Sequence, residues 1–117
     1  MIGLDRLIEM NGVIAAGQFS EDGKVIRKVG DIQDGVMEEI AGWCASQNKT
    51  ASQLVDFLDD NSDYNWRPLN GWAIWGGKYV IAVVGNTGVI VESTRADFNQ
   101  LIVDLLGSEP TGAKQIY

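Results

Sequence analysis

The sequence predicts an α+β fold, a three-layer α/β/α sandwich in which helices cover both faces of one β-sheet. The first observation is the order of the expected elements: a helix, two strands, a long helix, three strands and a last helix. The second is Tyr79–Val84, which is apolar at both alternating sets of positions, so both faces of this strand must be covered. The third is the length of 117 residues, enough for one domain. We expect residues 1–107 to form that domain and residues 108–117 to be a flexible C-terminal tail.

The first three elements follow from local patterns. Leu4–Met10 places apolar residues on one helical face, and Asn11-Gly12 ends it because glycine accepts a left-handed conformation. Val13–Phe19 and Lys24–Val29 predict two strands of a hairpin. Glu21-Asp22-Gly23 supplies the turn between them.

A long helix is predicted from about Asp34 to about Asp60. The small residues Ala15-Ala16-Gly17 of the first strand require close cover, and we expect a helix to supply it. Asp31 or Asp34 is expected to cap its start, and the polar stretch Ser46–Ser52 allows a kink. Its predicted apolar stripe is Val36, Ile40, Trp43, Gln47, Ala51, Leu54 and Leu58, widened by Met37, Ala41, Cys44 and Val55.

Three strands and a closing helix complete the chain. The strands are predicted at Gly71–Trp75, Tyr79–Val84 and Val89–Glu92, with turns at Gly76-Gly77 and Gly85-Asn86-Thr87-Gly88. Thr94 and Asp97, three residues apart, predict the start of the last helix. The core face of that helix is expected to be Phe98, Leu101, Ile102, Leu105 and Leu106.

Turn glycines and apolar residues recur in a fixed order from residue 4 to about residue 106. They are Leu4-Asp5-Arg6-Leu7, Gly12-Val13-Ile14-Ala15-Ala16-Gly17, Gly71-Trp72, Gly76-Gly77, Gly85-Asn86-Thr87-Gly88-Val89 and Ala96-Asp97-Phe98-Asn99. In this order the chain resembles the roadblock family of dynein light chains and bacterial GTPase regulators, and most closely an uncharacterised prokaryotic branch of it. The resemblance implies a profilin-like, five-stranded antiparallel sheet, with the long helix on one face and the terminal helices on the other. It also implies dimerisation through the long helix and the first strand of the meander.

The residues of that strand support the implied interface independently. Gly71–Trp75 contains two tryptophans and an isoleucine, and no charged residue stands between Gly71 and Gly77. A strand exposed at a sheet edge normally carries lysine, proline or a bulge that prevents pairing. The candidate homodimer interface is Trp43, Ala51, Trp72, Ile74 and Trp75. Alternatively, Trp72 and Trp75 pack on the helices of their own protomer, which must hold for one face of the strand.

Charge and composition restrict the partners. A formal charge of −7 disfavours nucleic acid and anionic membrane surfaces, because both require clustered lysine and arginine. The longest apolar runs, such as Val80–Val84, are too short to cross a bilayer, and no signal peptide is visible. A single cysteine forms no intrachain disulfide, which fits a reducing cytoplasm. The sequence therefore predicts a cytoplasmic protein without membrane insertion.

Residues for chemistry are scarce, since the chain contains no histidine and one cysteine. Cys44 lies within the long helix and is expected to be a core residue; a sulfur-carrying role is the alternative. Asp59, Asn61 and Asp63 have the opening spacing of a calcium loop, but Tyr64 replaces its glycine and Asn70 its glutamate. We therefore expect no catalytic residue, metal or cofactor, and no enzymatic activity.

Two features near residue 60 leave alternatives open. Asp59 and Asp60 oppose the negative end of the helix dipole, so either the helix ends one turn earlier or a cation lies nearby. Trp66-Arg67-Pro68 is either a partner-binding lip or a structural plug over the end of the sheet.

These observations predict a non-enzymatic homodimer that acts as a scaffold or adaptor. By resemblance, its partner is a small Ras-like GTPase or a multiprotein complex. The candidate docking surface is the outward polar side of the long helix, formed by Glu39, Ser46, Lys49, Gln53 and Asp56. A sensor domain that binds a small ligand is the alternative, and it requires an apolar cavity between sheet and helix.

Overall fold

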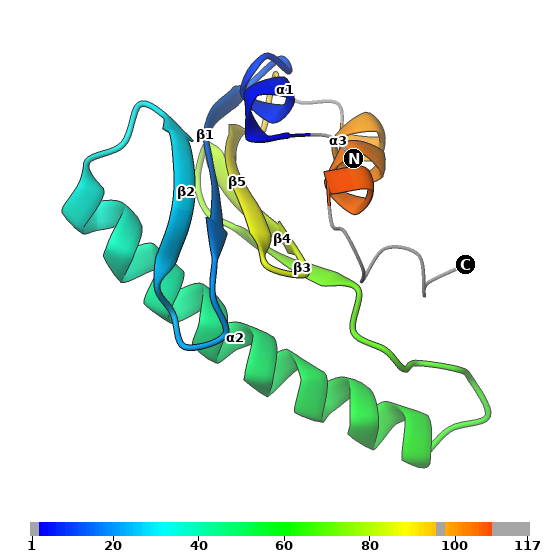
Figure 1. Ribbon diagram of the computed structural model, residues 1–117. Coiled ribbons are helices and arrows are strands. Elements are labelled where there is room, and N and C mark those ends of the chain that lie inside the picture. The colour runs from blue at the N-terminus through cyan, green and yellow to red at the C-terminus, as the bar shows by residue number, and fades with distance from the viewer. Residues whose placement is uncertain (1–2, 96–97, 109–117) are drawn as a thin grey trace.

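The computed structural model describes residues 3–95 and 98–108, and its elements follow the predicted order. They are α1 (Leu4–Ile8), β1 (Val13–Phe19), β2 (Val25–Gly30), α2 (Asp34–Asp60), β3 (Gly71–Trp75), β4 (Tyr79–Val84), β5 (Thr87–Glu92) and α3 (Phe98–Ser108). In Figure 1, α2 lies on one side of the sheet and α1 and α3 on the other, and the second half of α2 projects beyond the sheet. The predicted three-layer α+β fold is confirmed.

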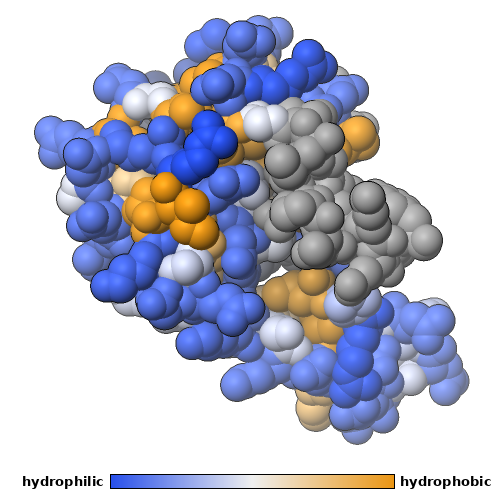
Figure 2. All heavy atoms as spheres, in the orientation of Figure 1, coloured by the Kyte–Doolittle hydropathy of each residue, from blue (hydrophilic) through white to orange (hydrophobic). Residues whose placement is uncertain are grey.

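The five strands form one antiparallel sheet in the order β2-β1-β5-β4-β3, so β2 and β3 are its edges. The β4–β5 turn is shorter than predicted: Thr87 and Gly88 belong to β5, and Val84 pairs directly with Thr87. Gly85 has a φ of 60°, a left-handed conformation that lets Gly85 and Asn86 alone close this turn. The face of the molecule in Figure 2 is mostly hydrophilic, with hydrophobic residues in separate patches.

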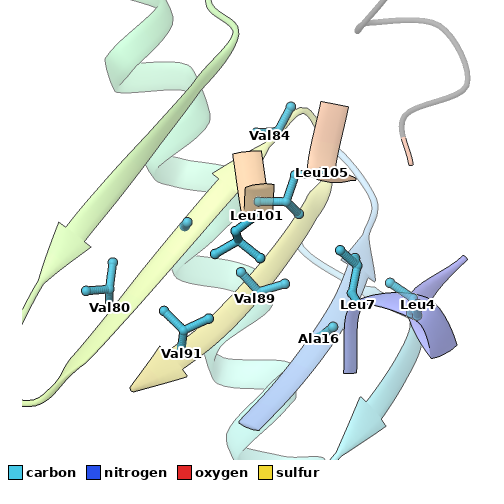
Figure 3. Close-up of a cluster of buried hydrophobic side chains, with 10 residues drawn as sticks. Leu4, Leu7, Ala16, Val80, Val84, Val89, Val91, Leu101 and Leu105 are labelled. Atoms are coloured by element: carbon cyan, nitrogen blue, oxygen red, sulfur yellow. The ribbon is translucent and has the colours of Figure 1, made fainter. Parts of the chain in front are cut away.

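One core cluster lies between the sheet and the two terminal helices (Figure 3). Its buried members are Leu4, Leu7, Ala16, Val80, Ala82, Val84, Val89, Val91, Leu101 and Leu105. The second cluster lies under α2 and consists of Phe19, Ala41, Cys44, Ala45 and Val83. Because β4 contributes Val80 to the first cluster and Val83 to the second, both faces of this strand are covered, as predicted.

The face that α2 turns to the sheet corrects the predicted stripe. Its buried residues are Met37, Ala41, Cys44 and Ala45, whereas Val36, Trp43 and Leu54 are exposed. The small residues of β1 explain this choice. A Cβ added at Gly17 would lie 3.3 Å from Cε and Sδ of Met37, so the helix approaches β1 closely.

The ends of α2 also differ from the prediction. The helix runs without a break, but neither Asp31 nor Asp34 caps it: the N-cap residue is Gln33, with no hydrogen bond from its side chain. Asp34 lies in the first turn instead, where its carboxylate is 2.9 Å from Nζ of Lys28. The same Nζ donates to the carbonyl of Ile32 at 2.8 Å, which ties β2 to the start of the helix.

The predicted start of the last helix is wrong. Thr94 lies in a turn and its hydroxyl donates to Glu92, while Asp97 lies outside the described residues. Leu101 and Leu105 are buried as expected, but Ile102 is exposed. The side chains of Phe98 and Leu106 are not among those described. α3 includes Gly107 and Ser108, and residues 109–117 of the predicted tail lie outside the described residues.

Candidate interaction surface

The outer edge of β3 carries backbone groups that no described strand pairs. On its inner side, Asn70 accepts from Gly85 N–H at 3.3 Å and Gly76 N–H donates to Tyr79 at 2.9 Å. Alternate residues of a strand bond to the same side, so the even-numbered residues face β4. The N–H and C=O groups of Gly71 and Ala73 therefore point toward the open edge.

One large side chain of β3 packs under α2, and the other two are exposed. Trp72 packs against the cluster under α2, and its Nε1 donates to Oδ1 of Asn48 at 2.6 Å. Ile74 follows on the same face but is 53% exposed, and Trp75 on the opposite face is 65% exposed. Trp72 thus packs on its own helix, as the alternative prediction required, whereas Trp75 remains largely exposed.

A stripe of exposed and half-buried residues runs along α2 beside its covered face. Ile40 of this stripe and Trp72 of β3 pack against the same core cluster under α2. The opposite flank, with Ala45 and Lys49, borders a hollow with Phe19 and Glu21 near the β1–β2 turn. Trp43 is 70% exposed and Leu54 58%. We call the combined set the β3–α2 surface: Val36, Ile40, Trp43, Gln47, Ala51, Leu54 and Leu58 of α2 with Ala73, Ile74 and Trp75 of β3. It contains no charged residue.

The predicted docking residues lie on the outward side of α2. Glu39, Ser46, Lys49, Gln53 and Asp56 are all exposed. The side chains of two of them already have partners within the protomer: Glu39 accepts from Nε1 of Trp43 at 3.3 Å, and Asp56 is paired with Arg67.

Arg67 is the cation that lies near Asp59 and Asp60 at the C-terminal end of α2. Its Nε, Nη1 and Nη2 lie 2.8, 2.8 and 3.1 Å from carboxylate oxygens of Asp56, Asp59 and Asp60. The helix therefore continues to Asp60, because the loop brings a positive charge to its negative end. Oδ1 of Asp59 also accepts the backbone N–H groups of Trp66 and Arg67, which together with the guanidinium hold the pKa of Asp59 below its ordinary value of 3.8. The sequence signal was an acidic pair at a helix end with one arginine seven residues later.

A model of the family described as "Uncharacterized conserved protein (DUF2173)" matches residues 3–107. The chain belongs to this family. Among solved structures, it is similar to a roadblock/LC7 domain from Streptomyces avermitilis, with a TM-score of 0.76, 13% identity, and coverage of 97% of this chain and 90% of that one. It is also similar to MglB of Myxococcus xanthus, with a TM-score of 0.72, 14% identity, and coverage of 97% of this chain and 87% of that one. For gliding protein MglB of Thermus thermophilus, the TM-score is 0.75 at 13% identity, with coverage of 95% of this chain and 83% of that one. These likenesses establish the roadblock fold for the DUF2173 chain. A comparison with curated proteins found no match.

The cysteine of this DUF2173 chain lies in the core. Cys44 is 5% exposed, and burial raises the pKa of its thiol to about 11. At neutral pH the thiol is therefore protonated and covered, which opposes the sulfur-carrying alternative.

The apolar cavity between β1 and α2 is small. It is bordered by residues such as Ala15, Met37 and Cys44, and offers about 30 Å³ to the centre of a water-sized sphere. This space suits a water molecule or two rather than a metabolite. Two wider hollows, about 270 and 220 Å³ on the same measure, are open to the surface beside Asn48 and Ser52. The geometry therefore does not favour the ligand-sensor alternative.

Within residues 3–95 and 98–108, no three His, Cys, Asp or Glu side chains are grouped as a metal site requires. In the same part of the chain, no helix combines the length and apolar character needed to cross a bilayer.

Proposed function

We propose that the chain forms a homodimer through the β3–α2 surface and acts as a non-enzymatic scaffold or adaptor in the cytoplasm. The observation that carries this proposal is an open edge strand without any charge, next to an uncharged helix stripe with exposed Trp43 and Leu54. Natural edge strands that remain single are guarded by charge, proline or a bulge. Contiguous exposed apolar residues of this kind mark protein interfaces. A second copy covers both elements at once.

The same proposal assigns the partner surface. In the homodimer, the outward faces of two long helices present Glu39, Ser46, Lys49, Gln53 and Asp56 twice. We assign this face to a small Ras-like GTPase, supported by the fold shared with MglB and by the resemblance to bacterial GTPase regulators. The dimer then supplies no catalytic group and acts by changing the positions of the switch loops of the GTPase.

The homodimer is tested by mass in solution for wild type, Ile74→Lys and Ile26→Lys. Ile74 and Ile26 are exposed isoleucines, 53% and 61%, on the two edge strands of the sheet, so they form a matched pair. We expect a dimer for wild type and Ile26→Lys, and a monomer for Ile74→Lys, because lysine in β3 is buried against the partner. A wild-type monomer at micromolar concentration, or two variants with the same mass, would contradict the interface.

The GTPase assignment is tested with purified small Ras-like GTPases from the same genome, loaded with GDP or a GTP analogue. We expect one of them to bind the dimer and Lys49→Glu to weaken that binding. Lys24→Glu, an equal charge change at an exposed position beside the β1–β2 turn, is the control. If no GTPase binds in either nucleotide state, this assignment is wrong while the homodimer stands.

A further inference from the structure

We infer that the two-fold axis of the homodimer passes by Ala73 of β3 and Gln47 of α2, and that Gln47 sets the register of the two protomers. This inference rests on the proposed homodimer and names the residues at its centre.

The strand alone has one symmetric pairing that uses its full length. Ala73 is the midpoint of Gly71–Trp75, and its backbone groups point toward the open edge. Antiparallel pairing centred there places Ala73 opposite its own copy and Gly71 opposite Trp75 of the partner subunit. A Cβ at Gly71 would lie 2.5 Å from the carbonyl oxygen of Val83, so this position stays bare in each protomer. The large indole of Trp75 therefore lies opposite Gly71, the smallest residue of the strand.

The helix has its own centre of symmetry. In the α2 stripe, Trp43 and Ala51 stand four residues on either side of Gln47, Ile40 and Leu54 seven, and Val36 and Leu58 eleven. Two copies packed antiparallel about Gln47 bring each residue against its counterpart, as facing helix surfaces require. The bulky Trp43 then lies over the small Ala51 of the partner subunit.

A side-chain contact joins α2 and β3 next to the two centres. The hydrogen bond of 2.6 Å from Trp72 Nε1 to Asn48 Oδ1 joins the residue before Ala73 to the residue after Gln47. An axis perpendicular to the sheet, passing the edge at Ala73, therefore also passes the helix layer near Gln47. One rotation therefore satisfies the pairing of the strands and the pairing of the helices.

Gln47 is the only amide within an otherwise apolar and small-residue stripe of α2. It is half-buried, and within the described part of the chain its side chain meets no hydrogen-bond partner. A primary amide both donates and accepts, so two copies facing each other across a two-fold axis exchange two N–H···O bonds. A shifted register would place each amide against apolar side chains, where an unpaired polar group is unfavourable. This difference selects one register.

The axis is tested by disulfide formation in the Cys44→Ala protein. Ala73→Cys brings two Cα atoms to about 5.5 Å in the proposed pairing, inside the range of about 4.4–6.8 Å that disulfides accept. Trp75→Cys leaves its two copies about 14 Å apart. We expect a covalent dimer for Ala73→Cys on mild oxidation and none for Trp75→Cys. Linking at position 75 in place of position 73 would overturn the proposed axis.

The role of Gln47 is tested by two equal charge changes on α2. Gln47→Glu places two carboxylates together at the axis, and we expect the dimer dissociation constant to rise at least about tenfold. Gln53→Glu places its two copies about 18 Å apart, beyond a Debye length of about 8 Å, and should leave that constant unchanged. Gln47→Leu keeps the dimer but relaxes its register, so Trp75→Cys now also forms a disulfide.

The outcomes separate this inference from the homodimer itself. A wild-type monomer by mass contradicts both. A wild-type dimer that Ile74→Lys dissociates, but that forms no disulfide at Ala73→Cys, keeps the homodimer and overturns the axis. An unchanged dissociation constant for Gln47→Glu overturns the role of Gln47.

Discussion

The two edges of the sheet differ in how they are protected. At one edge, β2 carries Arg27 and Lys28, and Lys28 reaches both the carbonyl of Ile32 and the carboxylate of Asp34. The pairing of β2 with β1 is also interrupted by an irregularity at Gln18/Phe19. At the other edge, β3 has neither charge nor irregular pairing. Charges and bulges prevent edge-to-edge association. The difference therefore indicates that a second copy pairs with β3 rather than with β2.

The largest expected effect comes from removing the exposed indole of the α2 stripe. Trp43→Ala removes a large exposed side chain that the proposed dimer buries twice, and an interface residue of this kind contributes about 2 kcal/mol or more per copy. We expect the dimer dissociation constant to rise roughly 1,000-fold. Sedimentation over a range of concentrations measures it.

The matched control is Trp66→Ala, on the loop at the far end of α2, where the indole is 44% exposed. It should leave the dimer intact. Trp66→Ala should unfold at nearly the wild-type temperature, since its indole does not belong to the core clusters. Trp43→Ala should keep the folded protomer, but its unfolding temperature falls because the dimer no longer stabilises it. Equal effects of the two variants on dimerisation would remove the distinction between the two surfaces.

A smaller effect is expected from removing the charge of Arg27 at the β2 edge. Arg27→Val turns the exposed part of β2 into an apolar strand while Lys28 keeps its ion pair with Asp34. We expect dimers to associate further through β2 at high concentration, because each dimer then has two unguarded edges. Light scattering should show mass above the dimer for Arg27→Val and not for Arg27→Gln. A strictly dimeric Arg27→Val protein would show that charge is not what protects this edge.

Acid should loosen the loop that leads into β3. Because the pKa of Asp59 in the folded protein is below 3.8, the ionised carboxylate stabilises the docked loop above that pH, and this contribution is lost as the pH falls through the folded pKa. We expect protection of the Trp66 and Arg67 amides against hydrogen exchange to fall below about pH 3.8. Asp22 also has a lowered pKa, from the hydroxyl of Ser20, so Asp59→Asn is needed as the control. If that variant shows the same acid loss, Asp59 is not its cause.

The sequence predicted the fold better than the orientation of its helix. Turn glycines and alternation placed the strands, because those signals are local. The α2 pattern contains two neighbouring apolar stripes, one led by Ala41 and Cys44 and the other by Trp43 and Leu54, and periodicity does not say which one faces the sheet. The choice follows from the contact of Gly17 with Met37, which leaves little space under the helix. The ion pairs of Arg67 depended on how the loop returns along α2, which is a tertiary property.

The smallest expected effect distinguishes those two stripes by chemistry. Cys44 lies on the covered stripe with a pKa near 11, so at pH 7 only about one thiol in 10,000 is ionised. We expect a thiol reagent to leave Cys44 unmodified in the folded protein. It should react at once in denaturant, where the burial that raises the pKa is absent.

Trp43→Cys in a Cys44→Ala background, one position away on the exposed stripe, should react as a free thiol in the monomeric Ile74→Lys protein and more slowly in the dimer. Rapid modification of native Cys44 would show that α2 lifts from the sheet. Equal reactivity of Trp43→Cys in monomer and dimer would show that the second copy does not cover this stripe.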